Sequence, residues 1–406
     1  MPNLDWTHTP PDYDGSCVTG IVPPLVTGRA GRLVPQDVCD APAVVVLVVD
    51  GLGWRQLERH RSVAPVLAGA DGAAVRPITT VAPSTTSAAL TSITTGATPG
   101  EHGVVGHTVP TEAGLLNTLR WTVPPQAGTG GAGDTDARSL VAPERLQPVE
   151  PFLGSRAVVV NRAKYAGSGF TAAHLRGARF VPWTSHRRLV DTALERVRRG
   201  DRLVFAYYDT LDRTAHRYGL GRRYRAVLAA VDAQVARLRA ELPAGVVLMV
   251  TADHGMVEVR EPRIELAGPL RGLATHSSGE ARFRWLHAAP GRAGELLAAV
   301  RRHDDVADVM TRAEVVAAGW LGPHLTSAAA ARLGDVALVA RAPVVFGAVA
   351  PARPPARPSA RPPAGGARAR PPAGGARARP PLIGHHGALT AEEMLVPLSV
   401  MRGARR

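Results

Sequence analysis

Four short runs of aliphatic and aromatic residues recur along the chain, at 43–49, 157–160, 203–208 and 246–251. The first, A-V-V-V-L-V-V, is almost entirely β-branched and is closed by Asp50-Gly51. Runs of this kind fit strands that are buried on both faces, as the strands of a parallel sheet are. They restrict the chain to folds in which helices cover a central sheet.

Helical patterns separate these runs and continue after them, at 87–95, 187–199, 222–241, 293–302 and 311–318. Strands that alternate with helices predict an α/β fold with a doubly wound, mostly parallel sheet, here with a smaller inserted cap subdomain. In such folds the functional site forms outside the carboxyl ends of the strands. We expect three units: a catalytic core at 1–256 plus 382–406, a cap at 257–350 and a linker at 351–381.

The formal net charge of +14 is unevenly distributed over the 406 residues. Seven arginines and no acidic residue lie in 351–381, where the nonapeptide PPAGGARAR occurs twice. Because this tract has almost no large apolar side chain to offset its ordering entropy, we predict that it is disordered. A tether to an anionic polymer is one interpretation, but the tract has no aromatic residue that would stack on bases. We favour a low-complexity expansion without a role and expect no nucleic-acid partner.

The longest apolar run, 43–49, is much shorter than the roughly 20 residues that cross a bilayer. The first twenty residues show no basic segment followed by an apolar one, so we predict neither a signal peptide nor a membrane span. The expected location is the cytoplasm. The sequence assigns no oligomeric state.

Metal-binding side chains follow the predicted strands or occupy later loops. They are Asp50, Asp212, His216, Asp253, His254 and His386. Zinc takes Asp oxygen and His nitrogen, and catalytic sites leave one position open. Asp212 and His216 are four residues apart and face the same way on a helical turn. Each position alone is weak, because a strand-terminal Asp is often a capping or turn residue, but together they predict a site for two metal ions.

A candidate nucleophile lies in 82–90, A-P-S-T-T-S-A-A-L, where a proline and several hydroxyl residues precede a helical pattern. This is typical of a helix N-terminus, where free N–H groups bind anions such as phosphate. A metal-activated hydroxyl in the first turn would attack phosphorus. The plain alternative is an ordinary Ser/Thr N-cap, and only the predicted metal site favours the nucleophile.

These motifs, in the order D-G, P-S-T-T, D-x-x-x-H, A-D-H-G-M and H-G, resemble those of the alkaline phosphatase superfamily. Within it the chain is most similar to the nucleotide pyrophosphatase/phosphodiesterase family, especially to its compact bacterial members. The similarity includes L-N-x-L-R-W at 116–121, A-G-S-G at 166–169 and E-E-M-L-V-P-L at 392–398. The C-x-P-S-R motif of the sulfatases is absent.

The resemblance implies two divalent metal ions, for which Asp and His ligands suit zinc best, with manganese and iron as alternatives. It implies that one ion is held by Asp212, His216 and His386. It implies that the other is held by Asp50, Asp253, His254 and the hydroxyl of Thr86. His386 is favoured over His385 because it directly precedes Gly387, as in the family's H-G motif.

The resemblance also implies that Thr86 is the nucleophile, by its spacing from Pro83 and Gly96, with Thr85 as the neighbouring alternative. The implied activity is hydrolysis of phosphodiester or pyrophosphate bonds in small, nucleotide-like phosphate esters through a covalent phosphothreonine. A phosphomonoesterase or phosphonate hydrolase using the same metal site is the alternative enzyme. An alternative of another class is a non-catalytic anion-binding protein tethered by the arginine-rich tract.

Two positions depart from the family's pattern. His107 lies 21 residues after Thr86, where these phosphodiesterases commonly have an asparagine that contacts a phosphate oxygen. His107 is therefore the candidate oxyanion contact. Ser87 stands where many members have an aromatic residue, which weakens the expectation of nucleotide preference. In the predicted cap, surface or core roles are expected for His276, Arg282 and Trp285, with substrate contact as the alternative.

Overall fold

The computed structural model describes residues 6–70, 72–125, 134–261, 263–350 and 381–403. Its larger α/β unit contains a seven-stranded sheet in the order β2-β19-β10-β1-β9-β7-β8. Neighbours from β10 to β8 pair in parallel, whereas β19 runs antiparallel to both β10 and β2. The strands are β1 (Val44–Val49), β2 (Ala74–Thr79), β7 (Val158–Arg162), β8 (Arg179–Trp183), β9 (Leu203–Tyr208), β10 (Val247–Thr251) and β19 (Leu395–Arg402).

The four apolar runs of the sequence form the centre of this sheet, as β1, β7, β9 and β10. All six residues of β1 and all five of β10 are buried, as expected of strands covered on both faces. The expected α/β fold with a mostly parallel sheet is confirmed. The edge strands β2 and β8 were not predicted, because they are partly exposed and lack a continuous apolar run, and β19, between β2 and β10, was not predicted either.

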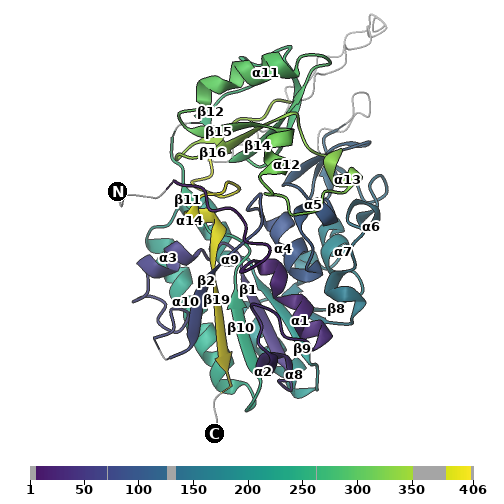
Figure 1. Ribbon diagram of the computed structural model, residues 1–406. Coiled ribbons are helices and arrows are strands. Elements are labelled where there is room, and N and C mark those ends of the chain that lie inside the picture. Colours follow the sequence, from purple (N-terminus) through teal and green to yellow (C-terminus); the bar gives the residue numbers. More distant parts are fainter. Residues whose placement is uncertain (1–5, 71, 126–133, 262, 351–380, 404–406) are drawn as a thin grey trace, which may run out of the picture.

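Helices cover the sheet on both sides, and Figure 1 shows α3 and α10 on one side of β19, β10 and β1, with α1, α4 and α7 on the other. Each of the five predicted helical segments matches a helix to within one or two residues at each end. The helices are α1 (Val22–Thr27), α2 (Gln36–Cys39), α3 (Trp54–Arg59), α4 (Thr86–Thr95), α5 (Pro99–His102), α6 (Pro143–Leu146), α7 (Gly169–Leu175), α8 (His186–Arg198), α9 (Thr210–Tyr218), α10 (Arg222–Glu241), α11 (Ala293–Val300), α12 (Arg312–Ala317), α13 (Ser327–Ala330) and α14 (Ala391–Met394).

A second sheet of eight strands lies above the first in Figure 1, in the order β15-β16-β14-β13-β3-β4-β5-β6. Its strands are β3 (Thr108–Thr111), β4 (Gly114–Asn117), β5 (Thr122–Val123), β6 (Thr135–Asp136), β13 (Ala274–Gly279), β14 (Phe283–Ala288), β15 (Ala307–Thr311) and β16 (Val336–Ala340). Two short pairs complete the strands: β11 (Val257–Glu258) with β18 (Gly384–His385), and β12 (Arg263–Ile264) with β17 (Val345–Phe346).

The second sheet joins two distant parts of the sequence, because β13 pairs with β3 through Gly279 and Thr108. Strands from the expected core, at 108–136, and from the expected cap, at 274–340, therefore share one sheet. The division of the chain into core and cap stays a proposal. The predicted linker at 351–381 lies, apart from its last residue, outside the described residues.

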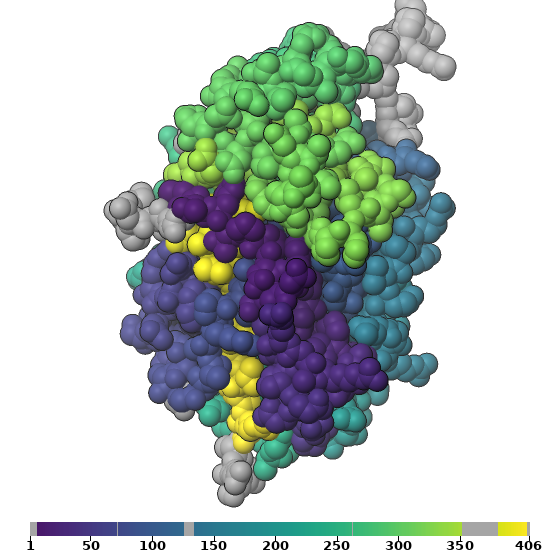
Figure 2. Space-filling view, in the orientation of Figure 1, coloured from purple at the N-terminus to yellow at the C-terminus, as the bar shows by residue number. Residues whose placement is uncertain are grey.

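The N-terminal segment runs across the face seen in Figure 2, where it is purple and the part of the second sheet's region from 274–340 is green. Its His8 Nδ1 lies 2.7 Å from an Asp308 carboxylate oxygen of β15. The Tyr13 hydroxyl donates to the carbonyl of Trp320 at 2.8 Å. The Asp12 N–H donates to Thr79 Oγ1 of β2 at 2.9 Å, so the segment contacts both sheets. The site described below lies between residues of both.

Among the helices of the described residues, none has both the length and the apolar character needed to pass through a bilayer.

Candidate active site

Acidic and imidazole side chains gather at the carboxyl ends of β1, β9 and β10. Asp50 follows β1, Asp212 lies in the first turn of α9 after β9, and Asp253-His254 follow β10. Because these strands are parallel neighbours, their carboxyl ends meet at one edge of the sheet. Gly51 makes the close approach feasible: its φ is +73°, and a Cβ there would lie 3.1 Å from the Asp212 Cα.

The first group of potential ligands consists of Asp50, Asp253 and His254, whose donor atoms lie within 4.8 Å of one another. Asp253 Oδ1 accepts hydrogen bonds from the main-chain N–H groups of Gly51 and His254, at 3.2 and 3.1 Å. The Tyr207 hydroxyl donates to Asp50 Oδ2. In each carboxylate one oxygen accepts the hydrogen bonds that orient the group, and the other oxygen is left to bind a metal ion.

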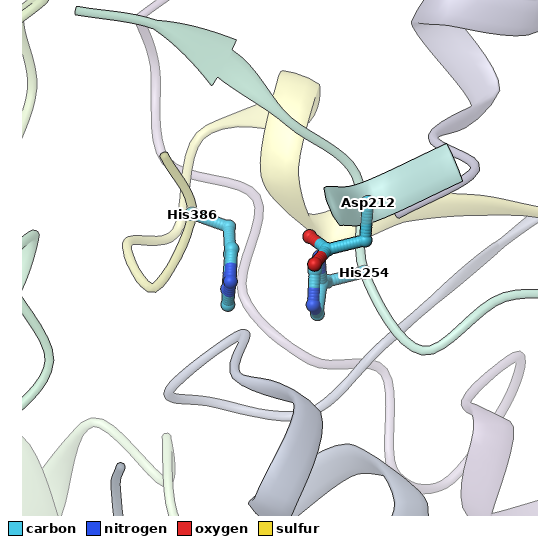
Figure 3. Close-up of side chains that lie close together, drawn as sticks. All are labelled: Asp212, His254 and His386. Atoms are coloured by element: carbon cyan, nitrogen blue, oxygen red, sulfur yellow. The ribbon is translucent and has the colours of Figure 1, made fainter. Parts of the chain in front are cut away.

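The second group consists of Asp212, His254 and His386, and its donor atoms also lie within 4.8 Å of one another. Figure 3 shows that these side chains converge from separate segments of the chain. The rings of His254 and His386 stack with centroids 3.6 Å apart. His216 lies beside this group, with Nε2 3.2 Å from Asp212 Oδ1. The structure therefore brings all six predicted Asp and His ligands together, whereas their assignment to particular ions stays a prediction.

The three histidines are oriented in the same manner. In each ring Nδ1 faces a main-chain carbonyl oxygen: Gly255 at 2.9 Å for His254, Ser84 at 2.8 Å for His386 and Gly384 at 2.7 Å for His216. A carbonyl only accepts, so Nδ1 carries the proton and the Nε2 lone pair is available to a metal. Burial also lowers the pKa of His386 well below its ordinary value, which keeps that ring neutral.

The charges of the carboxylates have no cationic partner in the part of the chain that the structure describes: no Arg or Lys there pairs with Asp50, Asp212 or Asp253. One buried oxygen of each of the three accepts no hydrogen bond. Burial raises the pKa of Asp50, and the charges of Asp212 and Asp253 raise it further. A divalent cation would offset the repulsion among the three carboxylates and would bind their unpaired oxygens. The donor set therefore fits the metal site predicted from the sequence.

Asp209 is a carboxylate at the same edge of the sheet that belongs to neither ligand group. It is buried, yet Arg162 Nε lies 2.6 Å away, and Lys164 and Arg213 each lie 3.5 Å away. The Tyr165 hydroxyl donates to it at 2.9 Å. Burial alone would raise its pKa, but the positive charge of Arg162 and these contacts lower it. Asp209 is therefore an ion-paired residue, unlike its neighbour Asp212.

The hydroxyls of Thr86 and Thr85 face different surroundings at the start of α4. Thr86 Oγ1 lies 3.1 Å from His254 Nε2, at the ligand groups. Thr85 Oγ1 instead donates to Glu280 Oε2 at 3.2 Å and makes no capping hydrogen bond with α4. Of the two candidate nucleophiles, only Thr86 has its hydroxyl at the ligand groups.

A cavity of about 580 Å³ opens over these groups. It is lined by Thr86, by the ligand residues Asp50, Asp212, His216 and His386, and by His107. Leu119, Tyr165 and Phe170 add an apolar wall, so there is room for an organic group as well as a phosphate. His107 thus shares a cavity with Thr86, which its candidate role requires.

Several other predicted candidates lie away from this cavity or face elsewhere. Arg282 is fully buried and pairs with Glu393, its Nε 2.8 Å from Oε1. Trp285 is also buried, and His276 stacks on His287; none of the three lines the cavity. His385 lines the cavity, but its Nε2 lies 3.1 Å from the carbonyl of Leu382, whereas His386 joins the ligand group.

Three residues near the site were not predicted: Tyr207, Glu280 and Asn117. Tyr207 donates to Asp50, and Glu280 accepts from Thr85. Asn117 Nδ2 lies 3.0 Å from His107 Nε2. Only Asn117 carried a sequence signal, since it belongs to the L-N-x-L-R-W motif. Tyr207 ends an apolar run and reads as core, and nothing near Glu280 in the sequence indicates its partner.

Comparison with known proteins agrees with this arrangement. The model of the type I phosphodiesterase/nucleotide pyrophosphatase family matches residues 44–348. Murine ectonucleotide pyrophosphatase/phosphodiesterase 5 is 18% identical, with a TM-score of 0.60 over 88% of this chain and 87% of its own. An inactive variant of that protein in complex with AMP gives the same values. Phosphonoacetate hydrolase from Sinorhizobium meliloti, in complex with phosphonoacetate, is 17% identical, with a TM-score of 0.62 over 89% of this chain and 90% of its own.

No curated protein sequence matches the chain. At identities this low, the similarity to solved structures establishes the fold.

Proposed function

Since the chain belongs to the type I phosphodiesterase/nucleotide pyrophosphatase family, we propose that it is a two-metal hydrolase of phosphodiester or pyrophosphate bonds with Thr86 as its nucleophile. The observation that supports this proposal is the position of the Thr86 hydroxyl beside the two ligand groups. Its Oγ1 lies 3.1 Å from His254 Nε2, and three buried carboxylate oxygens beside it have no partner.

Two divalent ions, which we propose to be zinc, would lower the pKa of the Thr86 hydroxyl and stabilise charge on the leaving oxygen. Asp212, His216 and His386 would hold one ion, and Asp50, Asp253 and His254 the other. In each of the three histidines Nδ1–H donates to a main-chain carbonyl. This hydrogen bond fixes the ring, so the Nε2 lone pair stays directed at the ion.

The residues of α4 support the nucleophilic step. Thr85, at the N-cap, makes no side-chain capping bond, so the first-turn N–H groups of this ten-residue helix are not satisfied by a cap and can donate to a phosphate oxygen. Thr86 Oγ would form a bond to phosphorus as the bond to the leaving oxygen breaks. A water would then break the Oγ–P bond and regenerate the hydroxyl. Two inversions give net retention of configuration at phosphorus.

The cavity favours an organic phosphate ester over inorganic phosphate as the bound species. Its volume of about 580 Å³ exceeds what one phosphate fills, and Leu119, Tyr165 and Phe170 line it. The AMP complex of the murine relative's inactive variant supports a nucleotide-like ester for this chain as well. His107 would contact a non-bridging oxygen of the bound phosphate.

Hydrolysis of bis-p-nitrophenyl phosphate and p-nitrophenyl phosphate by one metal-analysed preparation tests the proposal. We expect about two metal ions per chain and faster turnover of the diester. Faster turnover of the monoester would overturn the diesterase proposal. The similarity to phosphonoacetate hydrolase makes a phosphonate hydrolase the second candidate. Release of phosphate from phosphonoacetate, with no turnover of either ester, would favour it.

A further inference from the structure

His107 is held beside the first turn of α4 by main-chain contacts of the residue before it. The Gly106 carbonyl accepts a hydrogen bond at 3.2 Å from the hydroxyl of Ser87, which follows Thr86. The same carbonyl accepts from the Thr118 hydroxyl, also at 3.2 Å. His107 therefore enters the cavity from a segment that is fixed to the helix carrying the proposed nucleophile.

Glycines let this segment approach the neighbouring strand closely. A Cβ at Gly106 would lie only 2.7 Å from the Cα of Gly279, whose own φ is +85°. The next residue after Gly279 is Glu280, a half-buried carboxylate that also lines the cavity. Glu280, directly after β13, interacts electrostatically with His107, and Arg120, from the turn after β4, lines the same cavity.

The orientation of the Asn117 amide is fixed by the turn that follows β4. The Arg120 N–H donates to Asn117 Oδ1 at 3.0 Å, and the Trp121 N–H donates to the Asn117 carbonyl at 2.7 Å. An N–H group can only donate, so the side-chain atom facing Arg120 is the oxygen. The atom that faces His107 Nε2, at 3.0 Å, is consequently the NH₂ group.

The amide direction determines where the His107 ring carries its proton. The Asn117 NH₂ group donates, so His107 Nε2 accepts, and a neutral imidazole then has its hydrogen on Nδ1. Within the described part of the chain, His107 Nδ1 has no hydrogen-bond partner, and the ring lines the cavity. The His107 Nδ1–H group is thus left to donate to a molecule bound in the cavity.

We propose that Asn117 is a positioning residue that holds His107 in its Nδ1–H tautomer, so that Nδ1 donates to a phosphoryl oxygen of the substrate. The identity of the oxygen rests on the proposed function, whereas the tautomer is a property of the free protein. The opposite tautomer would direct a lone pair at the cavity and repel an anionic oxygen. Asn117 thus keeps the neutral His107 ring a hydrogen-bond donor toward the cavity.

Asn117→Asp separates positioning from a structural role. An Asp at 117 keeps an oxygen for the Arg120 N–H, and so preserves the turn, but it presents a second oxygen to His107 Nε2. Neutral His107 would then donate from Nε2 and lose its Nδ1 hydrogen. His107→Asn is the matched background, because it removes the ring while keeping an amide donor, and it has no tautomer for residue 117 to set.

Long-range ¹H–¹⁵N correlation spectra of ¹⁵N-labelled protein at pH 9 report the tautomer directly. The His107 signals are those missing from His107→Asn. We expect the Nδ1–H pattern in the wild type and the Nε2–H pattern in Asn117→Asp. An Nε2–H pattern in the wild type, or the same pattern in both proteins, would overturn the proposal whether or not the protein hydrolyses any ester.

Kinetics give a second, independent readout on the metal-loaded full chain. We expect Asn117→Asp to lower kcat/KM for the diester by about 10- to 100-fold at pH 9. In the His107→Asn background the change should stay within about 3-fold. A loss that persists without His107 would contradict positioning.

A wild type that hydrolyses neither esters nor phosphonates would refute the proposed function alone, and the spectra would then decide the tautomer.

Discussion

The cavity has two sides that are built differently. The ligand side comes from the edge of the seven-stranded sheet, from α4 and α9 and from the loop before α14, and it consists of Asp50, Asp212, Asp253, His216, His254, His386 and Thr86. The recognition side consists of His107, Asn117 and Glu280, which all lie on or beside strands of the eight-stranded sheet. On the ligand side the histidines and Asp253 are held by main-chain groups. On the recognition side His107 contacts the Asn117 side chain, and Glu280 accepts from both the Thr85 hydroxyl and the Ala281 N–H.

This difference indicates what each side does. Buried carboxylates such as Asp50, with no cationic partner and a raised pKa, form a site whose negative charge would be stabilised by a cation. Half-buried groups such as His107 and Glu280 can respond to what binds without such a requirement. We therefore expect substitutions on the ligand side to abolish activity and those on the recognition side to modulate it.

The largest expected effect follows from removing the nucleophile. Thr86→Ala should lower kcat/KM for the diester by about 10,000-fold, because no other serine or threonine hydroxyl contacts a side chain of the ligand groups in the described part of the chain. Thr85→Ala is the matched control, since its hydroxyl faces Glu280, and it should cost less than about 10-fold. Full activity in Thr86→Ala would refute the proposed role of Thr86.

The next effect tests whether the ligand side needs a cation. Asp212→Asn should lower kcat/KM by about 1,000-fold, or about 4 kcal/mol, because a ligand is lost. In chelator-treated protein the same substitution should raise Tm by about 1–3 °C, since it removes one of three mutually repelling buried charges. Steady-state kinetics measure the loss of kcat/KM, and scanning calorimetry with and without chelator measures Tm. A lower Tm in both states would mean that the carboxylate is already compensated by the protein.

Asp209→Asn is the control from the same strand end. Asp209 is compensated by Arg162, Lys164 and Arg213, so its loss should destabilise the protein by about 3 kcal/mol with or without chelator. The pKa of Asp209 is lowered in the folded state, so its contribution is present above the unfolded pKa of about 4 and lost as the pH falls. The difference in unfolding free energy between the wild type and Asp209→Asn should therefore shrink below pH 4.

The central strands and the ligand side could be predicted because the sequence signals for them are local. Burial on both faces makes β1 and β10 continuous apolar runs, and a ligand such as Asp50 or Asp253 directly follows the strand that positions it. Parallel pairing then brings these strand ends together without any further sequence signal. The second sheet gave no such signal, because strands such as β3 and β4 are four residues long and only partly buried.

The recognition side could be predicted only in part. His107 was found through its distance from Thr86, and its partner Asn117 lies on the next strand of the same hairpin. The position of Glu280 instead depends on pairing between β3 and β13, which lie far apart in the sequence. The bond from Thr85 to Glu280 spans 195 positions. Contacts of this kind depend on how two sheets meet, and no periodicity or spacing in one segment encodes that.

His107→Ala should have an intermediate effect if it supplies the oxyanion donor. Loss of one such donor typically costs about 100- to 1,000-fold in kcat, and the lower value is expected here because the first turn of α4 also donates. His107→Asn should recover most of the activity, since the amide also offers an N–H donor. Steady-state kinetics at pH 8 compare the two variants. Equal losses in both would indicate that the imidazole itself takes part in the reaction.

The smallest expected effect comes from the acidic member of the recognition side. Burial alone would raise the pKa of Glu280, but His107, the Ala281 N–H and Arg284 lower it, so Glu280 is ionised at neutral pH and repels an anionic substrate. Glu280→Gln keeps an acceptor for the Thr85 hydroxyl and should lower KM by about 2- to 5-fold, with kcat unchanged within about 2-fold. The gain should be larger at 20 mM than at 200 mM salt, because salt screens the repulsion. A loss of kcat as severe as that of Asp212→Asn would place Glu280 with the ligand side and remove the distinction between the two.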